Sequence, residues 1–124
     1  PTVTETPEIS PTPTGKPDDA SWISNTPPDY SIFSPGQDFD LVWIVRNTGT
    51  KTWNSTYTYR YQKGEKSHKK SSYNLRTTVP PGASVELIVD MNAAEKPGNY
   101  NVFWELVNEA GQPFYTVNFV YTVR

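Results

Sequence analysis

The distribution of apolar residues along this chain predicts an all-β fold. Several segments alternate apolar and polar side chains, which is the pattern of a half-buried strand. Turn sequences rich in Pro, Gly and Asn separate these segments, and no segment shows the 3.6-residue period of an amphipathic helix. Short strands at regular spacing form two packed antiparallel sheets. We therefore expect an immunoglobulin-like antiparallel β-sandwich of seven to eight strands, and the absence of cysteine means that it has no disulfide.

The composition limits the classes of protein to which the chain can belong. Its 124 residues are enough for one hydrophobic core. Without cysteine, packing alone must hold that core, and five Phe, eight Tyr and four Trp supply large side chains for it. A net charge of −2 argues against a nucleic-acid-binding domain, which would carry a basic face. No apolar run approaches the ~18 residues of a membrane-spanning helix.

The first residues differ from the rest in composition. Residues 1–17 contain five Pro and five Thr, no aromatic residue and no apolar period. Such a segment cannot bury enough surface to offset the entropy of ordering. We therefore expect residues 1–18 to be a disordered Pro/Thr-rich tether and residues 19–124 to be the folded domain.

The tether also carries a prediction about location. It resembles the Pro/Thr stalk that follows the signal peptide of bacterial surface lipoproteins, and the chain begins at Pro1 rather than Met. We therefore expect an upstream segment and an extracytoplasmic or cell-surface location. An interdomain linker in a cytosolic protein is the alternative.

Residues 39–46 give the clearest strand pattern, and we expect them to form the central strand. Asn47 and Gly49 follow it in a tight corner, for which both residue types are suited because they tolerate positive φ. The strand's alternate positions, expected to point into the core, are Phe39, Leu41, Trp43 and Val45.

Other strands are predicted over residues 20–25, 56–62, 71–79, 84–92, 100–107 and 114–123. The first is an edge strand, because Pro27 and Pro28 follow it. Pro97 and Gly98 turn the chain into the strand over 100–107, and Gly111 suits a left-handed turn in the last hairpin. Residues 63–70 are expected to form a solvated hairpin loop, with a loop that binds an acidic partner as the alternative.

The aromatic residues fall into two groups. The predicted core consists of Phe39, Trp43, Tyr100, Trp104 and Phe119, and the structural turns of Asn47, Gly49 and Gly98. A second group has no orientation fixed by the pattern, and an outward orientation would make it an exposed patch that binds a protein or a sugar. This candidate binding surface consists of Trp53, Tyr57, Tyr59, Tyr61 and Phe103.

No pattern in the sequence indicates catalysis. The single histidine, His68, lies in a Lys-rich loop without the signature of a nucleophile and its base, and we expect it to be exposed to solvent. Asp38 and Asp40 share one strand face, but no loop supplies the six or more oxygens that calcium requires. We predict no catalytic residue, no metal and no cofactor.

Several short motifs together resemble a known family. They are Trp43-x3-Asn47-x-Gly49-x3-Trp53, Pro81-Gly82, Pro97-Gly98-x-Tyr100-x3-Trp104 and Gly111-x2-Phe114. With Phe39, they resemble the four-tryptophan (FW) domain, the Ig-like central domain of the next-to-breast-cancer-one autophagy receptors, which is also found in bacterial proteins. The chain departs from that pattern in its last strand, where Phe119 stands for the expected tryptophan, while Trp22 takes an aromatic position near the domain start.

The resemblance implies an Ig-like fold and a protein-binding role without catalysis. We therefore predict a non-catalytic extracytoplasmic protein-interaction module on a flexible tether, whose partner is another protein. Two alternatives remain open: a carbohydrate-binding module that uses exposed aromatic side chains on a cell-surface glycan, and a structural spacer. Nucleic acid is not an expected partner.

Overall fold

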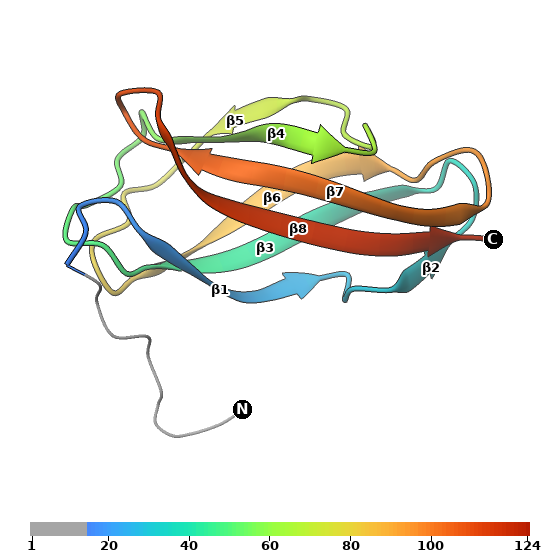
Figure 1. The fold of residues 1–124 in the computed structure, drawn as a ribbon, viewed down its shortest axis with the longest axis horizontal. Helices are drawn as coiled ribbons and strands as arrows, with labels where there is room; N and C mark the ends of the chain where they lie inside the picture. Colours follow the sequence, from blue (N-terminus) through green and yellow to red (C-terminus); the bar gives the residue numbers. More distant parts are fainter. Residues whose placement is uncertain (1–14) are drawn as a thin grey trace, which may run out of the picture.

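The computed structural model describes residues 15–124, which form two sheets packed face to face (Figure 1). The three-stranded sheet has the order β1-β3-β6, with β1 at Ala20–Thr26, β3 at Asp38–Asn47 and β6 at Ser84–Asn92. The five-stranded sheet has the order β2-β8-β7-β4-β5 and consists of β2 (Ser31–Phe33), β8 (Pro113–Val123), β7 (Gly98–Val107), β4 (Thr58–Gly64) and β5 (Ser72–Asn74).

The prediction of an all-β sandwich of seven to eight strands is confirmed, because the described residues contain eight strands and no helix. All strand pairs are antiparallel except the short pairing of β2 with β8. Strand β2 was not predicted, because its three residues are too few to show alternation. Residues 1–14 of the tether predicted over residues 1–18 lie outside the described part of the chain.

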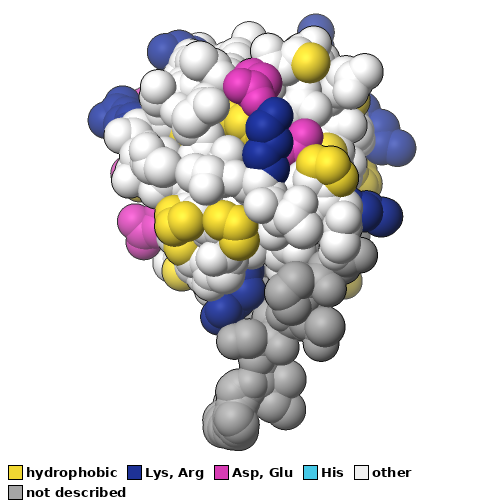
Figure 2. Space-filling model, turned by 90° about the vertical axis from the view of Figure 1, so that its left-hand side faces the viewer, with side chains coloured by type: hydrophobic (Ala, Val, Ile, Leu, Met, Phe, Trp, Pro, Cys, Tyr) yellow, Lys and Arg dark blue, Asp and Glu magenta, His cyan; other side chains and the backbone are white. Residues whose placement is uncertain are grey.

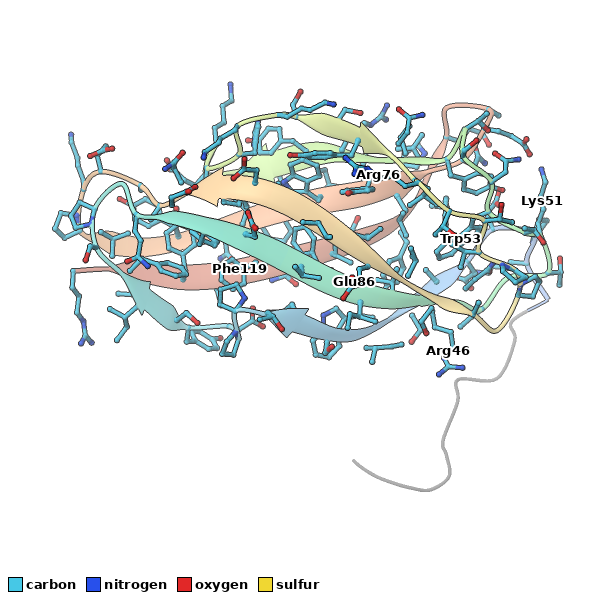
Figure 3. All side chains as sticks on the ribbon, turned by 180° about the vertical axis from the view of Figure 1, so that it is seen from behind. Arg46, Lys51, Trp53, Arg76, Glu86 and Phe119 are labelled. Atoms are coloured by element: carbon cyan, nitrogen blue, oxygen red, sulfur yellow. The ribbon has the colours of Figure 1, made fainter. Side chains whose placement is uncertain are left out.

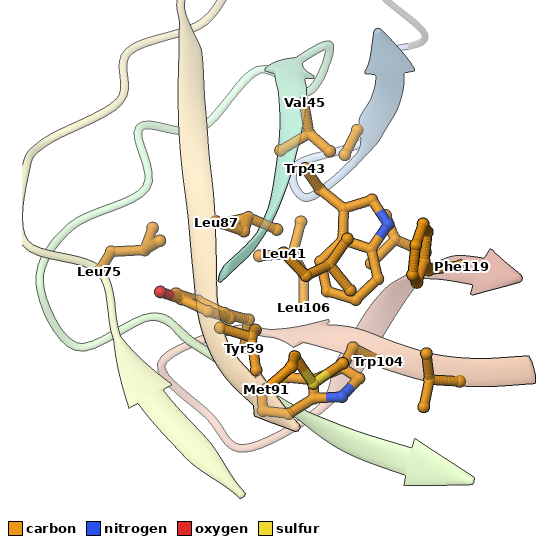
Figure 4. Close-up of a cluster of buried hydrophobic side chains, with 14 of the residues drawn as sticks. Leu41, Trp43, Val45, Tyr59, Leu75, Leu87, Met91, Trp104, Leu106 and Phe119 are labelled. Atoms are coloured by element: carbon orange, nitrogen blue, oxygen red, sulfur yellow. The ribbon is translucent and has the colours of Figure 1, made fainter. Parts of the chain in front are cut away.

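The core lies between the sheets and is built from the alternate residues of β3, β6, β7 and β8 (Figure 4). Trp43 of β3 and Trp104 of β7 are fully buried, with ring centroids 6.4 Å apart. The Trp43 indole N–H donates to the Asn118 carbonyl at 3.0 Å, so this polar atom is satisfied inside the core. Phe119 is also fully buried, whereas Phe39 and Tyr100 are half-buried and pack against the core at its margin.

The corner after β3, residues 47–51, is tight for a different reason from the one predicted. Neither Asn47 nor Gly49 has positive φ. The buried Asn47 side chain instead donates to the carbonyls of Lys51 and Val79, each at 2.9 Å, and accepts the Gly49 N–H at 2.9 Å. A Cβ on Gly49 would lie 2.4 Å from the Pro17 carbonyl oxygen. Glycine is therefore needed here because the N-terminal segment approaches closely.

That N-terminal segment belongs to the folded domain. Thr50 N–H donates to the Lys16 carbonyl at 2.8 Å and Lys51 N–H donates to the Pro17 carbonyl at 3.0 Å. Residues 16–18, predicted to be part of the tether, therefore make contacts with the folded domain. Composition could not reveal the contacts of Lys16 and Pro17, because they are made by backbone groups that any residue type carries.

Residues 65–70 are not the solvated hairpin loop that the sequence predicts. After β4 they cross to the three-stranded sheet and run beside the end of β6. Asn92 N–H donates to the Ser67 carbonyl at 2.7 Å, and Lys69 N–H donates to the Asp90 carbonyl at 3.0 Å. The segment therefore occupies the strand position next to β6 at Asp90–Asn92, which explains why Ser67 is buried.

Candidate functional site

The structure does not form the aromatic binding surface expected from the sequence. Trp53 and Tyr57 are fully buried, and Tyr59 is only 7% exposed. Tyr61 and Phe103 are half-buried, and the Lys63 ammonium group lies 4.9 Å from the Phe103 ring centroid. The five residues therefore do not make an exposed patch.

Trp53 and Tyr57 are buried because they form a second small core beside the β3 corner. Trp53 pairs with Val79 in an isolated bridge, and its ring lies 6.4 Å from Tyr57 and 5.7 Å from Phe114. The Tyr57 hydroxyl donates to the Asp18 carboxylate at 2.5 Å. Burial, with a smaller contribution from this carboxylate, raises the pKa of the Tyr57 phenol. Both aromatic residues precede the start of β4, so strand alternation could not assign their direction.

The outer surface of this end of the molecule is polar. Lys51 and Glu109 form an exposed ion pair, and Asn54 donates to the second Glu109 oxygen at 3.4 Å. The bond to Lys51 lowers the pKa of Glu109, and the same bond raises the pKa of Lys51. Figure 2 shows acidic side chains next to basic ones at this end, with apolar side chains in small separate groups. This end therefore offers no broad apolar surface for binding.

A groove with a volume of about 450 Å³ lies on the opposite side of the sandwich from β1, between β5 and β6. Tyr59, Tyr73 and Leu75 give it apolar walls, and Ile88 of β6 is 46% exposed along it. Two charged side chains, Arg76 on the segment after β5 and Glu86 on β6, lie on its two sides (Figure 3). We call this feature the β5–β6 groove.

Tyrosine hydroxyls within the groove bind backbone atoms of the β6 edge. The Tyr59 hydroxyl donates to the Ile88 carbonyl at 2.8 Å and accepts the Ile88 N–H at 3.2 Å. The Tyr73 hydroxyl accepts the Asp90 N–H at 3.3 Å. Burial raises the pKa of the Tyr59 phenol, so this side chain remains a hydrogen-bond donor at neutral pH.

These contacts show which backbone groups of β6 point away from β3. Successive residues of a strand direct their N–H and C=O groups to opposite sides, so Ser84 and Glu86 point the same way as Ile88. No strand of the described chain pairs with this side of β6 at Ser84 and Glu86. The groove therefore contains an open strand edge next to apolar walls.

A second, shallower groove of about 310 Å³ lies between β1 and β8. Trp22, which is 48% exposed, contributes its indole, whose N–H donates to the Asn25 side chain at 3.1 Å. The Trp22 backbone N–H donates to the Tyr115 hydroxyl at 2.7 Å. Trp22 is thus the exposed tryptophan of the chain, although the sequence analysis did not include it in the candidate surface. The sequence signal for this exposure was the position of Trp22 in a predicted edge strand, before Pro27 and Pro28.

His68 is not exposed to solvent as expected. It is half-buried, with its ring 4.7 Å from Tyr61 and 5.6 Å from Trp104 between centroids. Its Nδ1 atom is buried and has no hydrogen-bond partner among residues 15–124. Burial lowers the pKa of His68, and the charge of Lys66 lowers it further. The histidine is therefore mainly neutral at pH 7 and packs as an aromatic ring.

Within residues 15–124, no three His, Asp or Glu side chains lie close enough together to hold a metal ion. The same residues contain no helix with the length and apolar character needed to cross a membrane. The two grooves are therefore the candidate binding sites of the described residues.

Comparison with known proteins identifies relatives of the chain. It is 29% identical to Protein JOKA2 of Solanum tuberosum over 89 residues, which cover 69% of this chain and 10% of the relative. It is 26% identical to the autophagy receptor Nbr1 of Schizosaccharomyces pombe, covering 66% of this chain and 22% of the relative. It is also 26% identical to the Protein NBR1 homolog of Arabidopsis thaliana over 89 residues, which cover 69% of this chain and 13% of the relative. The chain thus spans less than a quarter of each of these relatives.

A solved structure, SSP-19, an MSP-domain protein like family member in Caenorhabditis elegans, aligns with a TM-score of 0.49 and 13% identity over 82% of this chain and 98% of that chain. The family model described as Ig-like domain from next to BRCA1 gene matches residues 26–123, which include the last residue of β1 and all of β2 to β8. The expected Ig-like class of the sandwich is therefore confirmed, and the chain belongs to the family of Ig-like domains from next to BRCA1 gene.

Proposed function

We propose that this domain is a non-catalytic protein-binding module and that its partner binds in the β5–β6 groove. The observation that carries the proposal is the combination of apolar walls from two sheets with an open strand edge in one concavity. Concave, mainly apolar surfaces with a few polar groups are typical of binding sites. The family supports the proposal, since one relative is named as an autophagy receptor.

The two other functions require different features of the structure. A carbohydrate-binding module requires exposed aromatic side chains that stack on sugar rings, and three of the five proposed residues are buried. Trp22, beside Asn25 and Asn118 in the shallower groove, is the one exposed tryptophan that could serve such a module. A structural spacer requires neither groove.

Two surface variants of the full chain distinguish these functions. Ile88→Lys places a positive charge in the β5–β6 groove, and Ile32→Lys is the matched control because Ile88 and Ile32 are 46% and 54% exposed. We expect the chain and Ile32→Lys to capture the same protein from the source organism, and Ile88→Lys to lose about tenfold or more in affinity. Binding to a glycan array that depends on Trp22 would instead support the carbohydrate module. Binding to neither proteins nor glycans would leave the spacer.

We also propose that the module is held outside the cytoplasm by its N-terminal segment. Only the Pro/Thr composition of residues 1–17 supports this location. The sequence of the full gene product tests it: a signal peptide and a lipid-anchor cysteine upstream of Pro1 would support the proposal, and a cytosolic domain there would contradict it.

We further infer that the domain is of the four-tryptophan type, with relatives among bacterial proteins. Three tryptophans at the matching positions, Trp43, Trp53 and Trp104, are fully buried. Phe119 is equally buried in the last strand and takes the place of the fourth. Bacterial surface proteins that align with this chain and carry tryptophan at the position of Phe119 would support the inference. If none of them carried tryptophan there, the inference would be contradicted.

A further inference from the structure

We propose that the β5–β6 groove receives an extended segment of the partner protein, which adds to β6 as a new antiparallel strand opposite Ser84 and Glu86. This proposal rests on the protein-binding function proposed above and specifies the chemistry of the partner segment. It assigns a main-chain role to two residues that the sequence analysis did not select.

The chain itself already extends this sheet along the C-terminal part of β6. Residues 67–69 pair with Asp90 and Asn92 on the same side of the strand. Where that segment leaves, the hydroxyls of Tyr73 and Tyr59 take over the bonds to Asp90 and Ile88. At Glu86 and Ser84 neither a strand nor a hydroxyl of the described residues continues the ladder. An added strand would therefore continue an existing pairing.

The open edge of β6 offers backbone hydrogen-bonding groups that suit another polypeptide. Glu86 and Ser84 each present one N–H and one C=O, and these four groups alternate donor and acceptor along the strand. Another polypeptide in extended conformation supplies the complementary groups at the same spacing. A purely apolar ligand would bury them without hydrogen-bond partners, which is unfavourable.

The two faces of β6 differ, and this difference predicts the side chains of the added strand. Val85 and Leu87 point into the sandwich, so guest residues opposite them would face the apolar walls at Tyr59, Tyr73 and Leu75. Guest residues at the alternate positions would point outward, beside the exposed carboxylate of Glu86. We therefore expect a segment with apolar residues at every second position and Lys or Arg between them.

The test begins with a phage-displayed library of random twelve-residue peptides, selected on the immobilised full chain. We expect enrichment of peptides in which apolar residues alternate with Lys or Arg. In an isotope-labelled sample, the bound peptide should slow hydrogen exchange of the Glu86 amide, because that N–H becomes part of a ladder. A peptide selected on the chain that leaves this amide unchanged binds elsewhere, which would overturn the added strand while leaving a protein-binding function intact.

Three variants then separate main-chain from side-chain recognition. Glu86→Pro removes the outward N–H from an edge where proline is tolerated, and we expect about a tenfold or greater loss of peptide affinity. Glu86→Lys keeps the N–H and reverses the charge, so it should favour peptides in which Glu replaces Lys. Trp22→Ala is the control on the other groove and should bind as the unaltered chain does.

Other outcomes would overturn the proposal. Equal affinity of Glu86→Pro and the unaltered chain, with Glu86→Lys showing no change in charge preference, would exclude strand addition at this edge. The absence of any enriched peptide would do the same, while capture of a folded partner that depends on Ile88 would still support the binding function. Protection of the Glu86 amide that appears only at high protein concentration, without peptide, would assign the edge to a second copy of the chain.

Discussion

The β3 corner and the β5–β6 groove both have backbone groups at the edge of a sheet that point away from the neighbouring strand. They differ in whether other residues of the chain form hydrogen bonds with these groups. At the corner, the N–H groups of Thr48, Thr50 and Lys51 bond to carbonyls of the chain's own residues 16–19. In the groove, the outward groups of Ser84 and Glu86 are bonded by no strand within residues 15–124. The sheet edge at the corner is therefore closed by hydrogen bonds within the chain, whereas the edge in the groove is open.

The difference shows that this fold closes its edges where the chain can reach them. Open edges favour association with other chains, and proteins usually cover or interrupt them. Residues 67–69 cover the C-terminal half of β6 at Asp90–Asn92. The N-terminal half, at Ser84 and Glu86, stays open beside the apolar walls of the groove. We therefore regard the open half as a functional feature, and the following predictions test it from the largest expected effect to the smallest.

The largest effect is expected from the aromatic side chain beneath the groove. The Trp104 ring lies 6.1 Å from Tyr59 and 6.0 Å from Tyr73 between centroids, so it supports both walls. Trp104→Ala should lower the free energy of unfolding by about 3–5 kcal/mol, and Trp43→Ala by a similar amount. Urea denaturation measures both, with Trp22→Ala as an exposed control that should change stability by less than about 0.5 kcal/mol. An unchanged midpoint for Trp104→Ala would show that the groove does not depend on this core.

The next effect concerns closure of the corner by the N-terminal segment. Deleting residues 1–18 removes the Lys16 and Pro17 carbonyls and the Asp18 carboxylate, which accepts from Tyr57 and Asn108. Since each of these four hydrogen bonds contributes about 1 kcal/mol net, we expect a loss of about 4 kcal/mol. The control deletes only residues 1–14 and should leave the melting temperature within about 1 °C. Equal melting temperatures for the two deletions would mean that the corner is closed without this segment.

A smaller loss of stability is expected from Gly49→Val. Any Cβ at this position would meet the Pro17 carbonyl oxygen at 2.4 Å, a backbone atom that cannot move alone. We expect a loss of about 1–3 kcal/mol, the usual cost of forcing extra atoms into a packed site. Thr50→Ala, at the exposed neighbouring position, serves as control in the same thermal denaturation. If Gly49→Val were as stable as Thr50→Ala, the close approach of the two segments would be wrong.

The smallest effect is a pH dependence of stability that arises from His68, in the segment that covers the C-terminal half of β6. Burial holds the pKa of His68 below its ordinary value of 6.5, so the unfolded chain takes up a proton first as the pH falls. Stability contributed by the neutral ring is thus complete above pH 6.5 and declines below it. Urea midpoints at about pH 7.5 and about pH 5.5 should differ more for the unaltered chain than for His68→Phe, which keeps the ring but cannot titrate. Equal differences would show that His68 is solvated in the folded protein.

The sequence predicted the strands and core better than the groove. Alternation assigned the inward face of β3, and the predicted core included Trp104 of β7 and Phe119 of β8, because these strands span enough residues for the period to show. It could not place Trp53 and Tyr57, which pack outside regular strands, or the short strand β2. The groove depends on where residues 65–70 stop pairing with β6 and on backbone groups that every residue type shares, and neither leaves a signal in composition.

The most direct test of the account compares amide hydrogen exchange at the two margins within one dilute sample of the chain. The Thr50 and Lys51 amides, which bond to Lys16 and Pro17, should be strongly protected. The Glu86 amide should exchange at close to the rate of an unprotected peptide, although its neighbours in β6 pair with β3. Protection of Glu86 equal to that of Thr50 in the monomer would show that the edge is already covered and would contradict the central claim.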